Sequence, residues 1–513
     1  PGSLRRTLVR NAVAGGGARA ITLVVGLLMT PYLLHRLGEA RFGIWALTTV
    51  VTGIVGVLDL SFKSSFIKFL AEFHARGDGP AHDRVVTTSV AFYGAFGIVA
   101  LGLFALFGGA LLEVLRIPAV LRAETFDVFL IALVGALVGG VLSVFPAMCD
   151  ARQRIDLTNG LGVVCLLLAT SVTVVALEMG GGLRSVALAQ LVGIVTFHAA
   201  GVALAWKVSG AIRLSLRDVS WAVFRRQFAF GLKLHVSSTC AIVNRQFDKI
   251  LLSRWAGLST VTSYEVGFRM AANAGSFQPY LAAALLPAAS QLDATGDRDR
   301  LVALYHRASR YLFMVGVPVF VFLAVHASVV ITAWLGKPEP MAARVLQLLA
   351  AGTMVNSLSN AMAFVCQGIG RPDIQAWQSA FQLVANIVMS VLLFWLIGPL
   401  GAPAGTSLAL ILGAAVFAVR FHPVLGTSTT ALLREAALAP VALSGAGSLG
   451  SWLATARFHA VGRADAFQEL ALAGGVFALV YLAGCWRSGL LGREELAVLR
   501  ASVSGGLGGM DSR

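Results

Sequence analysis

The sequence predicts an all-α polytopic membrane protein of about 14 transmembrane helices, in which two six-helix lobes related by a parallel repeat are followed by two C-terminal helices. Hydrophobic residues make up 57% of the 513 positions and charged residues only 13%, about half the charged fraction of a typical soluble protein. The mean hydropathy is +0.80, and apolar stretches recur along the whole chain. Matching features also recur at an offset of roughly 217 to 219 residues, as expected of an internal repeat. These observations exclude an ordinary cytosolic enzyme, a disordered chain and a disulfide scaffold.

Each helix is predicted from one stretch of about 20 mainly apolar residues, the length that crosses the hydrocarbon core of a bilayer. In chain order the predicted helices cover residues 11–34, 42–69, 85–112, 126–148, 157–178, 185–206, 228–252, 259–287, 309–334, 342–367, 374–397, 402–420, 434–455 and 466–486. The two helices on either side of GPLGAP, residues 398–403, could instead form one broken helix. Since the number of spans is even, both termini are expected on the same side of the membrane.

Lys and Arg in the loops predict which side that is, because the cytoplasmic loops of membrane proteins are enriched in them. With a cytoplasmic N-terminus, that side collects 24 of the loop cations, against 10 on the opposite side. We therefore expect a multi-pass protein of the cytoplasmic membrane with both termini inside. The net charge of +15 is spread over these loops, which favours contact with anionic membrane lipids and argues against a nucleic-acid partner.

The longest cytoplasmic connection divides the predicted helices into two lobes. Its Trp221 and Phe224, with Phe228 just beyond it, stand among Arg residues, as in a helix that lies in the membrane interface. The predicted organisation is an N-terminal lobe at 1–206, an amphipathic cytoplasmic linker at 207–227, a C-terminal lobe at 228–421, two further helices at 434–486 and a cytoplasmic tail at 487–513.

Two pairs of segments carry the repeat. LGEARFGIW at 37–45 corresponds to AGLSTVTSY at 256–264, which places Gly38 over Gly257. After the fourth and the tenth predicted helices, CDARQRID and CQGIGRPD share their Cys, Arg and Asp. Because each half has six helices, corresponding helices enter the membrane from the same side, so the repeat is parallel.

The same regions resemble a known family. Pro31 near the end of the first helix, LG followed by FGIW before the second, LDL within the second, and QFDKILL followed by SYEVGFR around the seventh and eighth are similar to the polysaccharide-export and O-antigen flippase branch of the multidrug/oligosaccharidyl-lipid/polysaccharide (MOP) superfamily. The likeness covers most of the first twelve helices, although Ser61 stands where that pattern often has Gly.

The resemblance implies a secondary-active transporter rather than an enzyme. Such a flippase moves an undecaprenyl-diphosphate-linked oligosaccharide from the cytoplasmic to the outer leaflet of the bacterial inner membrane by alternating access, for the synthesis of cell-surface polysaccharide. The implied partners are the undecaprenyl-diphosphate-linked glycan itself, a polysaccharide polymerase and other assembly proteins.

Independently of the resemblance, ionisable side chains inside the predicted helices indicate a polar site. They are Arg19, Asp59, Lys63, Lys233, Arg245, Asp248, Lys249, Glu265 and Arg269. Since a charge at the bilayer centre costs about 3 kcal/mol, these side chains must face water or partners rather than lipid. The set carries an excess of positive charge, which needs an anionic partner.

A diphosphate fits that requirement, because Arg and Lys bind phosphate oxygens strongly where bulk water is excluded. The residues expected to bind it in a central cavity between the lobes are Arg19, Lys63, Lys233, Arg245, Lys249 and Arg269. The carboxylates Asp59, Asp248 and Glu265 are expected either to pair with them or to couple transport to H⁺ or Na⁺. The sequence predicts no metal site and no cofactor.

Structural roles stay open for several of these residues. Lys63 and Lys233 could reach the cytoplasmic interface as anchors, and Asp248 with Lys249 could form a structural pair. For His198, which lies within a predicted helix, a structural hydrogen bond is the alternative to a proton relay.

Three other functions stay open as well. A MATE-like ion-coupled multidrug exporter of cations would need an acidic pocket, whereas the predicted site is net positive. A membrane enzyme acting on the same lipid would usually need a sizeable outer loop, whereas the predicted outer loops have about a dozen residues. A scaffold of the polysaccharide assembly complex would not need charges inside its helices.

Overall fold

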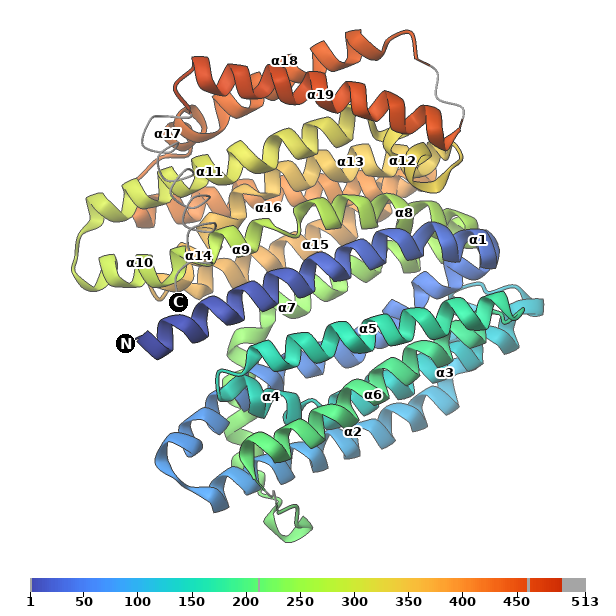
Figure 1. The fold of residues 1–513 in the computed structure, drawn as a ribbon, viewed down its shortest axis with the longest axis vertical. Helices are drawn as coiled ribbons and strands as arrows, with labels where there is room; N and C mark the ends of the chain where they lie inside the picture. The colour runs from blue at the N-terminus through green and yellow to red at the C-terminus, as the bar shows by residue number, and fades with distance from the viewer. Residues whose placement is uncertain (1, 211–212, 459–461, 491–513) are drawn as a thin grey trace, which may run out of the picture. The chain divides into compact units, whose positions relative to one another are not determined.

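The computed structural model describes residues 2–210, 213–458 and 462–490, and within them every regular element is helical. The protein is therefore all-α, as the sequence predicts (Figure 1). In chain order the elements are α1 (Gly2–Arg76), α2 (Gly79–Val114), α3 (Ala119–Leu142), α4 (Val144–Ala151), α5 (Ile155–Glu178), α6 (Leu183–Ser209), the 3₁₀ turn η1 (Leu216–Asp218), α7 (Trp221–Ala256), α8 (Leu258–Gly275), α9 (Gln278–Ala282), α10 (Leu285–Ala294), α11 (Arg298–Val325), α12 (Ala327–Leu335), α13 (Pro340–Asn356), α14 (Leu358–Gly368), α15 (Pro372–Ile397), the 3₁₀ turn η2 (Gly398–Leu400), α16 (Gly401–Leu425), α17 (Thr429–Leu432), the π-helical turn η3 (Leu433–Ala437), α18 (Leu438–Thr455) and α19 (Arg463–Arg487).

Polar residues in the gaps between apolar stretches fix where several helices begin. The side chains of Asp78, Ser220 and Asp297 accept hydrogen bonds from backbone N–H groups in the first turns of α2, α7 and α11. These N–H groups have no partner within the helix, so each cap stabilises a helix start. The helix boundaries thus follow from local sequence signals.

Most turns between helices pass through a residue with positive φ, and these residues form pairs along the chain. In the first half they are Gly38, Gly77, Arg116, Gln153, Gly180 and Gly210, and in the second half Gly257, Gly296, Gly336, Gly370, Gly398 and Gly426. Each residue of the second set follows its counterpart by 216 to 220 positions. Residues with a Cβ atom rarely adopt positive φ, so a matched series of such turns is not expected of unrelated segments. The structure confirms the repeat and extends it from two sequence segments to six turns.

The turn after α4 shows how closely the two halves agree. The Arg154 N–H donates to the Cys149 carbonyl oxygen over 3.0 Å, and the Arg154 guanidinium lies 3.4 Å from an Asp156 carboxylate oxygen. The turn after α14 repeats this hydrogen bond at 2.8 Å and this ion pair at 3.0 Å, with the equivalent residues Cys366, Arg371 and Asp373. The Cys, Arg and Asp that the two sequence motifs share therefore form the same contacts in two equivalent turns.

Ten segments of the described residues are long and apolar enough to cross a membrane, so the protein is a multi-pass membrane protein. Two of these segments, Ala14–Gly53 and Pro372–Leu425, each contain two of the predicted helices in whole or in part. The predicted helices at 228–252 and 259–287 are not among the ten. The first lies within α7, whereas the second is wrong as a single helix, because the structure divides it among α8, α9 and the start of α10. Helices α7 and α8 carry most of the charged residues of the predicted site, and those charges lower their hydropathy. The number fourteen therefore stays a prediction.

Contacts divide the chain into two compact units, of which the first comprises residues 1–266 and 379–405. Within it α2, α3, α5 and α6 run side by side (Figure 1), and α1 packs on α7. Buried side chains from α1, α2, α4 and α6 form one core, which includes Phe66, Phe69 and Tyr93. The lobe boundaries given by the sequence stay a prediction.

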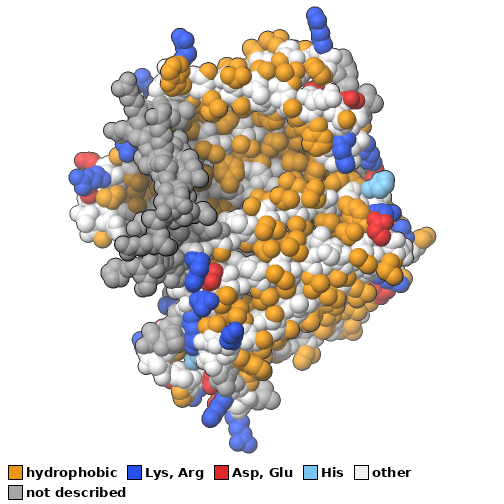
Figure 2. All heavy atoms as spheres, viewed as in Figure 1, with side chains coloured by type: hydrophobic (Ala, Val, Ile, Leu, Met, Phe, Trp, Pro, Cys, Tyr) orange, Lys and Arg blue, Asp and Glu red, His pale blue; other side chains and the backbone are white. Residues whose placement is uncertain are grey.

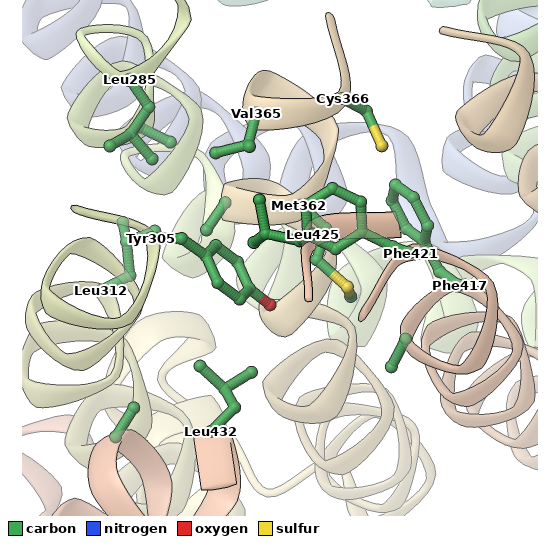
Figure 3. Close-up of a cluster of buried hydrophobic side chains, with 14 of the residues drawn as sticks. Leu285, Tyr305, Leu312, Met362, Val365, Cys366, Phe417, Phe421, Leu425 and Leu432 are labelled. Atoms are coloured by element: carbon green, nitrogen blue, oxygen red, sulfur yellow. The ribbon is translucent and has the colours of Figure 1, made fainter. Parts of the chain in front are cut away.

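The second unit comprises residues 267–378 and 406–513. Figure 3 shows its main core, in which Tyr305 of α11 lies among apolar side chains of α10, α14 and α16. The Tyr305 hydroxyl is 2.9 Å from His422 Nε2. Elsewhere in this unit His326 Nε2 lies 2.8 Å from the Ser451 hydroxyl. Both histidines thus have hydrogen-bond partners inside packed helices.

Candidate functional site

A buried ion pair joins two of the charged helices in the first unit. Lys249 Nζ of α7 lies 2.8 Å from Glu265 Oε2 of α8, and the two side chains are only 3% and 4% exposed. The same ammonium group donates to the Thr49 hydroxyl of α1 over 3.0 Å, and Thr49 in turn donates to Gln246 Oε1. Because a buried charge is stable only when it is paired and hydrogen-bonded, this network holds α1, α7 and α8 in one arrangement.

Asp248, the neighbour of Lys249, has a different partner. Its carboxylate accepts a hydrogen bond of 2.9 Å from the Tyr264 hydroxyl, and both residues are fully buried. Two consecutive residues of α7 are therefore bonded to two consecutive residues of α8, Tyr264 and Glu265. The sequence did not indicate this pairing, since nothing local links residues that are 16 positions apart.

A close approach of two backbones positions this network. A Cβ atom at Gly43 would lie 2.5 Å from the Leu258 carbonyl oxygen, so only glycine fits there. Nearby, the Thr262 hydroxyl donates to the Glu39 carbonyl oxygen over 2.6 Å. The part of α1 that follows the turn at Gly38 thus packs directly against the start of α8.

Two of the predicted phosphate-binding residues are exposed cations. Arg19 of α1 and Arg245 of α7 are both exposed, and neither forms an ion pair with a carboxylate within the part of the chain that the structure describes. Arg245 and the buried Lys249 therefore have opposite environments on the same helix. Arg269 of α8 is partly buried.

Three predicted site residues cannot be placed. The side chains of Asp59, Lys63 and Lys233 lie outside the described residues, so their expected roles stay predictions. The assignment of the other six residues to a substrate or coupling site is likewise still a prediction.

The first unit also contains a cavity of about 460 Å³ between α1, α3, α4, α5 and α6. Its polar lining includes Asp150, Asn159 and His198, and the Thr158 hydroxyl donates to Asp150 over 2.7 Å. Gly139 of α3 makes room for His198, because a Cβ atom there would lie 3.3 Å from its Nε2 atom. The volume lies within the range of about 300 to 1,000 Å³ typical of ligand sites. With these polar side chains in an otherwise largely apolar lining, the cavity could admit water and small hydrophilic groups.

Sequence reasoning weighed a proton relay against a structural hydrogen bond for His198, but it did not predict this cavity and missed Asp150 and Asn159. The available signal was their position in and just after the CDARQRID motif, which marks a turn that both halves of the chain share. Cys149 and Arg152 stand close to Asp150 in the chain. Burial raises the pKa of the Cys149 thiol. Burial also lowers the pKa of the Arg152 guanidinium, which donates a hydrogen bond to the Val208 carbonyl oxygen.

Comparisons with known proteins bear on this arrangement. The family model described as "Polysaccharide biosynthesis protein" matches residues 33–338, more than half of the chain. A protein of Shigella flexneri named as an O-antigen transporter is 20% identical over 413 residues, which is 80% of this chain and 96% of that protein. A protein of Haloferax volcanii named as a low-salt glycan biosynthesis flippase is 23% identical over 208 residues, 40% of this chain and 44% of that protein.

Solved structures share the fold. The lipid II flippase MurJ in an inward closed conformation has a TM-score of 0.77 at 12% identity, covering 95% of this chain and 100% of that chain. An inward-facing multidrug resistance MATE family transporter of the MOP superfamily has a TM-score of 0.67 at 16% identity, covering 84% and 100%. At these identities the likeness shows the fold alone.

Proposed function

The chain belongs to the polysaccharide biosynthesis protein family, and from this premise we propose that it is a flippase for a lipid-linked oligosaccharide. Its named relatives are a transporter and a flippase, which supports a transporter rather than an enzyme. The proposed substrate is an oligosaccharide linked to undecaprenyl diphosphate, moved from the cytoplasmic to the outer leaflet of the bacterial inner membrane. Both termini are proposed to be cytoplasmic.

The observation that supports a diphosphate in the substrate is the exposure of two cations, Arg19 and Arg245. Each belongs to the first helix of a predicted lobe, and neither has a carboxylate partner among the described residues. An Arg side chain facing lipid would cost about 3 kcal/mol at the bilayer centre, so we place both side chains in a water-filled site. There the planar guanidinium groups would bind the diphosphate oxygens in pairs of hydrogen bonds.

Transport would follow alternating access, in which the site opens first to one side of the membrane and then to the other. The membrane potential favours outward movement of an anion by about 2.3 kcal/mol per charge per 100 mV. Coupling to H⁺ or Na⁺ is proposed for Asp59, Asp248 or Glu265. Of these, the structure describes Asp248 and Glu265, whose contacts with Tyr264 and Lys249 link their protonation to the packing of α7 on α8.

A host that lacks the gene provides the test. We expect such cells to accumulate the lipid-linked oligosaccharide and to lose the surface polysaccharide. The unaltered gene and an Arg225→Ala variant should restore export, because Arg225 is an exposed residue of α7 outside the proposed site. Arg19→Ala and Arg245→Ala should fail to restore it at equal protein level. Restored export by both variants would remove these residues from the site.

The fold likeness to a MATE transporter favours a second candidate, an ion-coupled multidrug exporter. This candidate predicts a different result in the same cells. Loss of the gene would raise sensitivity to cationic drugs and leave the pool of lipid-linked oligosaccharide unchanged.

A further inference from the structure

A small pocket lies in the first unit where the end of α1 and the starts of α2 and α7 meet. Its volume is about 140 Å³, and its lining includes Phe69, Arg84, Arg226 and Gln227. None of these residues belongs to the Lys249 network or to the cavity that contains Asp150. The pocket is therefore distinct from both of these described sites.

Two positive charges meet in this pocket. Arg84 of α2 and Arg226 of α7 both line it, and neither forms an ion pair with a carboxylate among the residues that the structure describes. The Arg226 guanidinium stands over the ring of the buried Phe69, 4.8 Å from its centroid. This cation–π contact fixes the guanidinium before any ligand arrives. Such a pair of arginines is suited to an anion with several oxygen atoms.

The buried side-chain amide of Gln227 indicates that the ligand also has a hydrogen-bond donor. Its side chain is only 1% exposed, and its Nε2 atom donates to the Ser89 hydroxyl over 3.4 Å. Since Ser89 gives its own proton to the Val85 carbonyl oxygen, this contact must use the amide nitrogen of Gln227. Gln227 Oε1 is buried and accepts no hydrogen bond from any described atom. A hydroxyl group on the ligand would satisfy it and remove the cost of a buried acceptor without a donor.

The surroundings of the pocket place it at the level of a membrane surface. Arg84 lies in the second turn of Gly79–Val114, one of the membrane-crossing segments. Trp221 of α7 is 74% exposed and stacks on Phe224, with 4.8 Å between the ring centroids, an arrangement typical of side chains at the membrane interface. Figure 2 shows Lys and Arg side chains at the lower end of the molecule, where Figure 1 draws the loop that precedes α7.

We propose that this pocket binds the phosphate group of an anionic membrane lipid whose head group carries a hydroxyl, the chemistry of phosphatidylglycerol. Arg84 and Arg226 bind the phosphate oxygens, and Gln227 accepts from the head-group hydroxyl. The volume is less than half of the roughly 300 Å³ at which sites for whole ligands begin, so the pocket holds a head group and not an oligosaccharide. The bound lipid would tie α1, α2 and α7 together at the membrane surface.

Lipid binding by the purified full-length protein tests this proposal, for example by native mass spectrometry after addition of defined lipids. The unaltered protein should retain phosphatidylglycerol in preference to phosphatidylcholine. Arg84→Ala and Arg226→Ala should each weaken phosphatidylglycerol binding about tenfold, equivalent to about 1.4 kcal/mol. Arg225→Ala is the matched control, because Arg225 is exposed on the same helix and does not line the pocket. The midpoint of thermal unfolding of each variant shows whether it is folded.

A second comparison isolates the hydroxyl. Gln227→Leu should weaken binding of phosphatidylglycerol but not of phosphatidylmethanol, which has the same charge and no head-group hydroxyl. Equal losses in Arg225→Ala and Arg226→Ala would overturn the proposal, because they would indicate a general attraction to anionic lipid. Displacement of the lipid by millimolar inorganic phosphate would overturn it in favour of a free-anion site. Preferential displacement by a polyprenyl diphosphate would overturn it in favour of a substrate entry site.

Discussion

Breaking the ion pair between Lys249 and Glu265 should destabilise the protein far more than removing both charges. The two side chains are 3% and 4% exposed and their charged atoms are 2.8 Å apart, so Lys249→Met leaves the Glu265 carboxylate buried without its ammonium partner. Removing one member of a buried pair costs about 3 to 5 kcal/mol. Glu265→Met should cost a similar amount, because it leaves the Lys249 ammonium group buried without its carboxylate partner.

The double variant Lys249→Met/Glu265→Met should recover most of the loss, since apolar residues of similar volume often replace a buried pair at little cost. The assay is thermal unfolding of the purified protein in detergent, followed by its remaining monomer peak in size-exclusion chromatography. We expect each single variant to lower the midpoint by roughly 3 to 5 °C and the double variant to lie closer to the unaltered protein. A double variant whose loss equals the sum of the two single losses would refute the reasoning, because it would show that the two charges do not interact.

Three further predictions use the same unfolding assay or simple labelling. Gly43→Ala should lower the unfolding midpoint, since its Cβ atom would lie 2.5 Å from the Leu258 carbonyl oxygen. Gly16→Ala is the control and should leave the midpoint unchanged or raise it, because a Cβ atom there would have nothing within 4 Å. Equal midpoints for the two variants would contradict the close approach of the backbones at Gly43. Tyr264→Phe should lower the free energy of unfolding by about 1 to 3 kcal/mol, because it removes the hydrogen bond that the buried Asp248 carboxylate accepts from Tyr264; an unaltered midpoint would count against this hydrogen bond. All five cysteines are buried, and burial raises the pKa of Cys149. A maleimide reagent at neutral pH should therefore label the cysteines only after the protein is denatured. Rapid labelling before denaturation would show that the packing around a cysteine is wrong.

Local signals in the sequence were sufficient to predict the all-helical fold class and the internal repeat. Apolar stretches of bilayer length predict the helices, because a membrane requires every spanning segment to satisfy its own backbone hydrogen bonds. The offset between Gly38 and Gly257 predicts the repeat, because a turn with positive φ favours glycine in both halves. Gln153 shows the limit of that signal. It occupies the turn that Gly370 occupies in the second half, so residue identity alone conceals the correspondence there.

The contacts of the site could not be predicted in the same way. Lys249 and Glu265 lie on different helices, and their pairing depends on the packing of α7 against α8. Glu265 and Arg269 stand four positions apart on one helix, a spacing that allows them to pair, whereas nothing in the sequence indicates Lys249 as a partner of Glu265. The cavity at Asp150 depends on five helices, and the sequence showed only that its turn recurs. Charges inside helices can therefore be found from sequence, but their partners require the structure.

The proposed flippase activity is tested most directly by the rate at which purified protein in liposomes moves a lipid-linked oligosaccharide diphosphate from one leaflet to the other. We expect the unaltered protein and Arg225→Ala to accelerate this movement over protein-free liposomes. The initial rate should be at least about tenfold lower for Arg19→Ala and Arg245→Ala, equivalent to the loss of about 1.4 kcal/mol of phosphate binding. Movement at the unaltered rate in both arginine variants, or no acceleration by the unaltered protein, would contradict the proposed function.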